Sequence, residues 1–164
     1  MSPEFSRTLV LAHVPAGGQA LRLEADEAER AALARRFGLL ALHALGAELR
    51  LSPGPEGRVQ VEGALRAEVE QACVVSLEPV RQRLEEAVAW RLLPEGIEPS
   101  DGDDDPDDIP SEGGVADLGE ALAQQLSLAL DPYPRAPGAT LPAEAGDGAA
   151  HGPFAALAKL RPRE

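Results

Sequence analysis

The stretch VQVEGALRAEVEQACVVSLEPVRQRLEEAVAWRLLP, residues 59–94, decides the fold. Over residues 59–71, apolar side chains occupy most odd positions and polar ones most even positions, which is the period of a β-strand with one buried face. Beyond residue 79, the apolar side chains continue on even positions as far as Leu92. The pattern predicts a β-hairpin.

A helix is the competing interpretation of residues 80–92, because aliphatic side chains there also recur every four positions. At about 100° per residue, Arg91 would then lie in the middle of the apolar face and Trp90 well off it. Gln82 and Glu86 interrupt the apolar row of a strand. The strand still accounts for more of the pattern, so we predict a strand.

The 164 residues suffice for one domain with a tail or an insert, but not for two substantial cores. We expect a single domain over residues 1–138, interrupted by a disordered acidic insert at about 95–114, and then a flexible linker and tail over 139–164. Residues 8–14 lack the basic approach and cleavage site of a signal peptide, and no apolar run approaches membrane-spanning length. We therefore expect a cytoplasmic protein without membrane contact, and we favour a monomer.

The net charge of -13 is unevenly distributed. Residues 1–94 hold 13 acidic and 11 basic side chains, residues 95–132 hold 12 acidic and none basic, and residues 133–164 hold 3 acidic and 4 basic. The protein as a whole repels polyanions over long range. Its arginine-bearing faces could still contact a polyanion locally.

Several elements are expected before the hairpin. Residues 5–14 predict an opening strand that carries His13 at its end, where that histidine is structural or exposed. Asp26 caps a helix that ends before Gly38. Residues 39–52 form a strand, so that three consecutive antiparallel strands make a meander.

The second predicted helix begins at Asp117, and its leucines recur every four residues up to Leu130. Three prolines then stiffen residues 131–138, and residues 153–160 form a short helix. The predicted fold class is α+β, with an antiparallel β-meander or partly closed sheet, two packed helices, a disordered acidic insert and a short C-terminal helix.

The acidic insert places carboxylates at several positions of a calcium loop. Asp101, Asp103, Asp105 and Glu112 match its positions 1, 3, 5 and 12, but Pro106 stands where the loop turns on glycine. We reject this loop and expect no bound metal. A metal-dependent hydrolase that uses the aspartates is the least favoured function, since carboxylates of a two-metal site need rigid support. The insert is expected to be solvated, or to act as a polyanionic arm.

One cysteine, Cys73, can form neither an internal disulfide nor, by itself, a zinc site. We expect it to be a small buried hydrophobe. No nucleophile motif or glycine-rich phosphate loop is found, so the sequence favours a non-enzymatic protein without a cofactor.

Three segments carry a resemblance to a known family. CVVSLEPV at residues 73–80, DLGEALAQQLSLALDPYPRAPGA at 117–139 and GPFAALAKL at 152–160 are similar, in this order, to the YceD-like family of large ribosomal RNA subunit accumulation proteins. The resemblance implies a bacterial or plastid, non-enzymatic factor for 23S ribosomal RNA accumulation or processing. Many members have a Cys-x-x-Cys pair here, whereas this chain has Cys73 and, at the second position, Ser76. A metal role of the relatives is therefore not expected to carry over to this chain.

Two classes of non-enzymatic function follow. One is a factor for large ribosomal subunit biogenesis that binds ribosomal RNA or ribosomal proteins, and the other is an acidic protein–protein adaptor without RNA contact. An ion-paired surface is the alternative role of each arginine. The candidate contact residues are Arg66, Arg81, Arg83 and Arg91 on the exposed phase of the hairpin, Arg135 after the second helix, and Phe154, Lys159, Arg161 and Arg163 in the tail.

Overall fold

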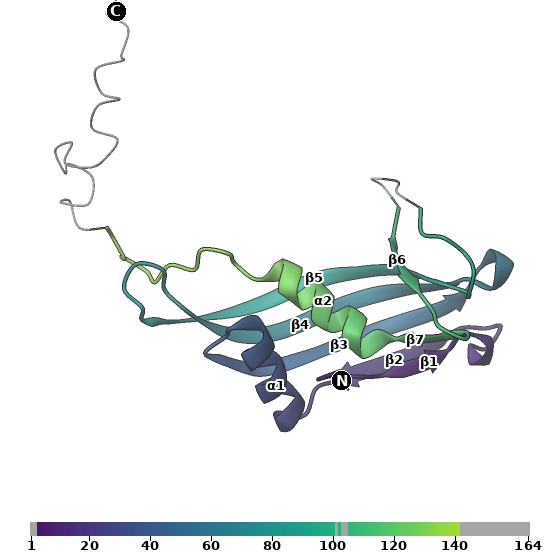
Figure 1. Ribbon diagram of the computed structural model, residues 1–164, viewed down its shortest axis with the longest axis horizontal. Helices are drawn as coiled ribbons and strands as arrows, with labels where there is room; N and C mark the ends of the chain where they lie inside the picture. The colour runs from purple at the N-terminus through teal and green to yellow at the C-terminus, as the bar shows by residue number, and fades with distance from the viewer. Residues whose placement is uncertain (1–2, 101, 103–104, 142–164) are drawn as a thin grey trace, which may run out of the picture.

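A five-stranded sheet is the main feature of the computed structural model, which describes residues 3–100, 102 and 105–141 (Figure 1). Its first four strands pair antiparallel in sequence order, and the fifth runs parallel to the fourth. The sheet is open and combines with helices, which confirms the α+β class. Its strands are β2 (Gln19–Glu24), β3 (Ala41–Pro53), β4 (Val59–Ala72), β5 (Pro79–Leu93) and β6 (Asp107–Pro110).

The predicted hairpin is formed by β4 and β5. Its register places Val61 opposite Trp90 and Gln71 opposite Val80. Val61 and Trp90 are at most 2% exposed, and the odd positions of β4 share the buried face with the even positions of β5. The predicted alternation is therefore confirmed.

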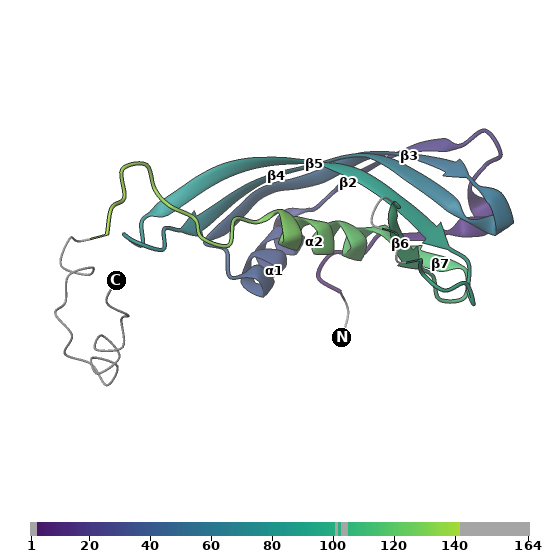
Figure 2. The ribbon, with the colours of Figure 1, turned by 90° about the horizontal axis from the view of Figure 1, so that it is seen from above.

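Two helices, α1 (Glu27–Phe37) and α2 (Leu118–Ala129), cover the same face of the curved sheet (Figure 2). The predicted caps of α1 are both present. The Asp26 carboxylate accepts the N–H of Glu29, and the Glu29 carboxylate accepts the N–H of Asp26. Gly38 ends the helix with a left-handed backbone at φ 65°.

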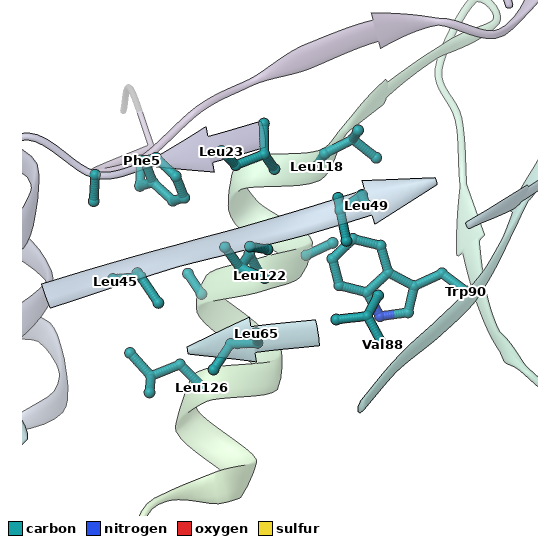
Figure 3. Close-up of a cluster of buried hydrophobic side chains, with 14 of the residues drawn as sticks. Phe5, Leu23, Leu45, Leu49, Leu65, Val88, Trp90, Leu118, Leu122 and Leu126 are labelled. Carbon is teal, nitrogen blue, oxygen red and sulfur yellow. The ribbon is translucent and has the colours of Figure 1, made fainter. Parts of the chain in front are cut away.

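Leucines of α2 pack against leucines of the sheet and fill the core between helix and sheet (Figure 3). The polar atom of the buried Trp90 side chain is also satisfied there, because its Nε1 donates to Gln125 Oε1 at 2.9 Å. Gln125 Nε2 in turn donates to the Ala87 carbonyl at 2.7 Å. The leucines of α2 that are fully buried are Leu118, Leu122 and Leu126.

At Gly63, β3 approaches β4 too closely for a side chain. A Cβ there would overlap the Glu48 carbonyl oxygen and would lie 3.0 Å from the Leu49 Cα. The glycine is therefore required by the distance between the two backbones and not by its own dihedral angles.

The predicted opening strand is wrong in its extent. Only β1 (Thr8–Val10) is extended, it pairs with β7 (Val115–Asp117) in a separate two-stranded sheet, and the 3-10 turn η1 (Leu11–His13) follows it. The reason is that Asp117 holds the preceding residues: it accepts the Ser6 hydroxyl at 2.6 Å and the Arg7 N–H at 2.8 Å. β2 was not predicted either, so the antiparallel part of the sheet has four strands instead of three.

The prediction of a wholly disordered insert at residues 95–114 is also wrong. Its second half forms β6 and leads into a buried Ser111, whose hydroxyl donates to the Leu93 carbonyl at 2.6 Å. Arg91 supplies the counter-charge that an acidic strand needs, because it binds Asp108 directly. Within the described residues, neither helix is long and apolar enough to cross a membrane. The predicted helix at 153–160 and most of the linker before it lie outside the described part of the chain.

Candidate functional site

Two segments far apart in the sequence meet at one end of the sheet (Figure 1). They are the β4–β5 turn, residues 73–78, and the chain that leaves α2, residues 131–136, and together we call them the turn end. The Val74 N–H donates to the Pro134 carbonyl at 2.8 Å. Gln71 Nε2 donates to the Asp131 carbonyl at 3.0 Å. These bonds hold the two segments side by side.

Cys73 lies at the centre of the turn end, with a fully buried side chain. Its Sγ accepts backbone N–H groups from Ala136 at 3.2 Å and from Val75 and Ser76 at 3.4 Å each. The sulfur thus connects both segments. The expectation of a merely hydrophobic cysteine is wrong in this respect, since Cys73 is buried but serves as a hydrogen-bond acceptor.

These donors change the acidity of the thiol. The Ala136 N–H, followed by the Ser76 hydroxyl and backbone, lowers the pKa of Cys73 to about 6, although burial opposes the shift. Ser76, which stands at the second position of the Cys-x-x-Cys pattern, therefore supports the anionic sulfur by hydrogen bonding. These hydrogen bonds therefore favour the thiolate form of Cys73.

The turn end presents apolar side chains to solvent around this anchored centre. Val74 is 48% exposed, Leu77 77% and Tyr133 72%. Leu77 has a positive φ of 62°, a conformation that is costly for a γ-branched side chain and is tolerated because its N–H donates to the Cys73 carbonyl at 3.0 Å. Arg135, a predicted contact residue, is also exposed and follows Tyr133 by two positions in the same segment.

Three of the predicted arginines lie on the face of the sheet that the helices leave uncovered. Arg66 lies 3.2 Å from Glu85 and 3.6 Å from Glu48. Arg81 lies 2.7 Å from Glu68, and Arg83 lies 3.8 Å from the same carboxylate. Because each arginine has an acidic neighbour, this face carries a network of exposed ion pairs and not a concentrated basic patch. A polyanion would have to compete with these carboxylates.

Arg91 is placed differently from the other predicted arginines. Its Nε donates to Asp108 Oδ1 at 2.6 Å and its Nη2 to Asp108 Oδ2 at 3.0 Å. The Asp108 side chain is only 4% exposed, and the bond to Arg91 is the main reason why the pKa of Asp108 is lowered. Arg91 therefore attaches β6 to β5.

The acidic insert contributes little that resembles a metal centre. Asp105 accepts the Ser100 hydroxyl at 3.1 Å, and Asp101 and Asp103 lie outside the described residues. In the part of the chain that the structure describes, no three His, Cys, Asp or Glu side chains are grouped to hold a metal ion. His13 is exposed at the end of η1.

The remaining predicted contacts, Phe154, Lys159, Arg161 and Arg163, lie outside the described residues. The predicted contact residues do not include Val74, Leu77 and Tyr133. A sequence signal for them does exist. Val74 and Leu77 are apolar residues inside a turn, and Tyr133 stands between two prolines, at positions where polar residues are usual. Their proximity could not be found, because it depends on contacts between segments about 60 residues apart.

The fold and the turn end together describe an α+β domain with an open sheet and with a small apolar surface presented by two anchored segments. The family described as "Large ribosomal RNA subunit accumulation protein YceD" matches residues 61–161, which include both segments of the turn end. The chain belongs to this family. No curated protein and no solved structure matches the chain.

Proposed function

We propose that the chain is a non-catalytic binding factor of the bacterial cytoplasm that supports accumulation of 23S ribosomal RNA during large-subunit biogenesis, and that the turn end is its contact surface. The family description supports the general role. The residue-level support is the construction of the turn end, where a buried sulfur and backbone bonds fix two segments and leave Leu77 and Tyr133 exposed.

This arrangement suits binding because its backbone is already ordered in the free protein, so little conformational entropy remains to be lost on binding. Exposed aromatic and aliphatic side chains on an ordered backbone lose little freedom on contact. Tyr133 can stack on an unpaired base or pack against a protein, and Arg135 beside it can pair with a phosphate or a carboxylate. Large-subunit precursors offer both kinds of partner.

The test is co-sedimentation with large-subunit precursor particles. The double variant Leu77→Ser/Tyr133→Ala should bind these particles markedly less than the natural chain. Leu128→Ala is the matched control, because Leu128 is also a highly exposed apolar residue (85%) but lies on α2. If both variants bind as well as the natural chain, the turn end is not the contact surface.

An acidic protein–protein adaptor without RNA contact is the second candidate. The ion pairs of Arg66, Arg81 and Arg83 favour it, because these arginines already have carboxylate partners. Crosslinking in the particles, with identification of both RNA and protein partners, separates the two candidates. RNA crosslinks to residues of the turn end support the first, and crosslinks to proteins alone support the second.

A further inference from the structure

One edge of the sheet is largely open. β6 pairs with β5 only over residues 90–93, so residues 79–89 of β5 are paired on one side with β4 and, in the described chain, with no strand on the other (Figure 1). Unpaired strand edges of this length attract other strands, and proteins usually protect them. The edge therefore requires either protection or a partner.

The direction of the free backbone groups follows from two hydrogen bonds. The carbonyl of Ala87 accepts the Gln125 amide, and the carbonyl of Leu93 accepts the Ser111 N–H in the segment that follows β6. Both carbonyls point away from β4. Since backbone groups of alternate residues share a direction in a strand, Arg81, Arg83 and Glu85 also offer their N–H and C=O groups to the open edge.

The side chains along this edge complement a second copy of the same edge. In an antiparallel pairing centred on Leu84, Leu84 lies opposite itself, Arg83 lies opposite Glu85, and Gln82 lies opposite Glu86. The register is also correct for the backbone, because the outward-directed residues 83 and 85 face each other as a hydrogen-bonded pair. Charge, side-chain type and backbone direction thus agree on one register.

This pairing accounts for two residues that the core does not explain. Gln82 and Glu86 lie in the apolar row of β5 on the helix-covered face, where Glu86 is exposed and Leu84 between them is only partly buried. Across the two-fold axis each glutamine would meet a glutamate, and the two Leu84 side chains would cover each other.

The charged side chains are exposed enough to make this contact. Arg83 is 88% exposed, and its carboxylate neighbour within the chain, Glu68, lies 3.8 Å away. Glu85 is 67% exposed and would be shared with Arg66, which lies 3.2 Å from it. The Gln125 bond to the Ala87 carbonyl is no obstacle in principle, because a carbonyl oxygen can accept two hydrogen bonds.

We propose that two copies of the chain associate through β5, residues 81–87 of one copy pairing antiparallel with the same residues of the other to form a continuous ten-stranded sheet. The two-fold axis passes through the Leu84 pair, perpendicular to the sheet, so that the helices of both copies lie on one face. This dimer replaces the monomer that the sequence favoured.

The test is sedimentation velocity over a concentration series in the micromolar range, at low salt. The natural chain should shift with concentration towards twice its mass of 17.2 kDa. Arg83→Glu and Glu85→Arg should each remain monomeric, because each places like charges opposite one another. An equimolar mixture of the two variants should form a heterodimer, because every 83–85 pair in it joins opposite charges. Arg50→Glu, on β3 away from the edge, should behave as the natural chain.

A second variant keeps the test valid if the charge changes disturb folding. Leu84→Cys would bring two thiols together at the axis, where Cα atoms of a non-hydrogen-bonded pair are about 4.5 Å apart, which is within the range of a disulfide. Mild oxidation should crosslink this variant quickly and the exposed control Glu62→Cys slowly. A natural chain that remains monomeric at all concentrations, a monomeric mixture, or equal crosslinking of the two cysteine variants would overturn the proposal.

Discussion

Arg91 and Asp108 form a two-point ion pair that fastens β6 to the edge of the main sheet, with N–O distances of 2.6 and 3.0 Å. Asp108 also accepts the backbone N–H of Ser100 at 2.7 Å. The pair therefore orders a segment in which acidic side chains would otherwise repel one another.

Arg91→Ala should lower the melting temperature, because Asp108 would keep a nearly buried charge without its main partner. The effect should depend on pH. The pKa of Asp108 is lowered in the folded protein, so the pair stabilises the fold above the ordinary aspartate pKa of about 3.9, and this stabilisation is lost as the pH falls through the folded value. The gap in melting temperature between the natural chain and the variant should therefore narrow in acid. Arg50→Ala is the control, and an unchanged melting temperature in Arg91→Ala would contradict the role of the pair.

Cys73→Ser should be less stable than the natural chain, and the difference in free energy of unfolding should grow as the pH rises. The folded pKa of Cys73 is about 6, whereas a thiol in an unfolded chain titrates near 8.5. The thiolate therefore adds stability as the pH rises from about 6 to about 8.5. Serine stays neutral over this range and gains none. Denaturant unfolding at pH 5.5, 7 and 8.5 measures the difference, and a constant gap between the two proteins would show that Cys73 is a neutral thiol.

Gly63→Ala should destabilise the fold by about 1–3 kcal/mol, which is typical of forcing extra atoms into a tightly packed site. The new methyl group would push against the Glu48 backbone, which cannot move without disturbing β3. Gly17→Ala is the matched control, since a Cβ at Gly17 meets no atom within 4 Å. Urea unfolding of both variants gives the comparison, and equal stability would mean that β3 and β4 separate easily.

Asp117→Ala should destabilise the fold by about 0.5–2 kcal/mol, the usual range for loss of an N-cap. Asp117 accepts the N–H groups of Gly119 and Glu120 at the start of α2, and it also holds Ser6 and Arg7. Asp117→Asn should retain most of the stability, because an amide oxygen can still cap the helix. If the two variants unfold at the same denaturant concentration, the cap bonds contribute little.

Deletion of residues 152–164 should leave the fold intact and weaken association with large-subunit precursors. The segment carries Lys159, Arg161 and Arg163 on an otherwise acidic protein, so its contribution should fall as salt is added. Circular dichroism checks the fold, and co-sedimentation at two salt concentrations measures binding. Equal co-sedimentation of both proteins at low salt would remove the tail from the proposed function.

Local patterns predicted much of the fold. Alternation in the hairpin, the cap at Asp26 and the leucine spacing of α2 all depend on residues close in sequence, and the structure has each of them. β2 was not predicted, although Leu21 and Leu23 alternate there with Arg22 and Glu24.

Features that depend on distant residues could not be predicted. β6 depends on a charge pair between residues 17 apart, and the turn end depends on a bond between Cys73 and Ala136, which are 63 apart. The composition of the insert predicts that its acidic side chains repel one another. It does not show that one of them, Asp108, is buried and forms an ion pair with Arg91. Of the turn end, the contact prediction therefore included only Arg135, and the apolar part emerged from the tertiary contacts.

The pairing of β1 with β7 sets the order in which a growing chain can complete its fold. The hairpin partners β3, β4 and β5 are neighbours in sequence and can assemble early, whereas Thr8 must wait for Asp117, more than one hundred residues later. Phe5, buried in the finished protein, therefore stays without its packing partners on α2 until most of the chain has left the ribosome. The N-terminus, although synthesised first, therefore gains its partners late, and pulsed hydrogen exchange during refolding should show Thr8–Val10 gaining protection after β4 and β5.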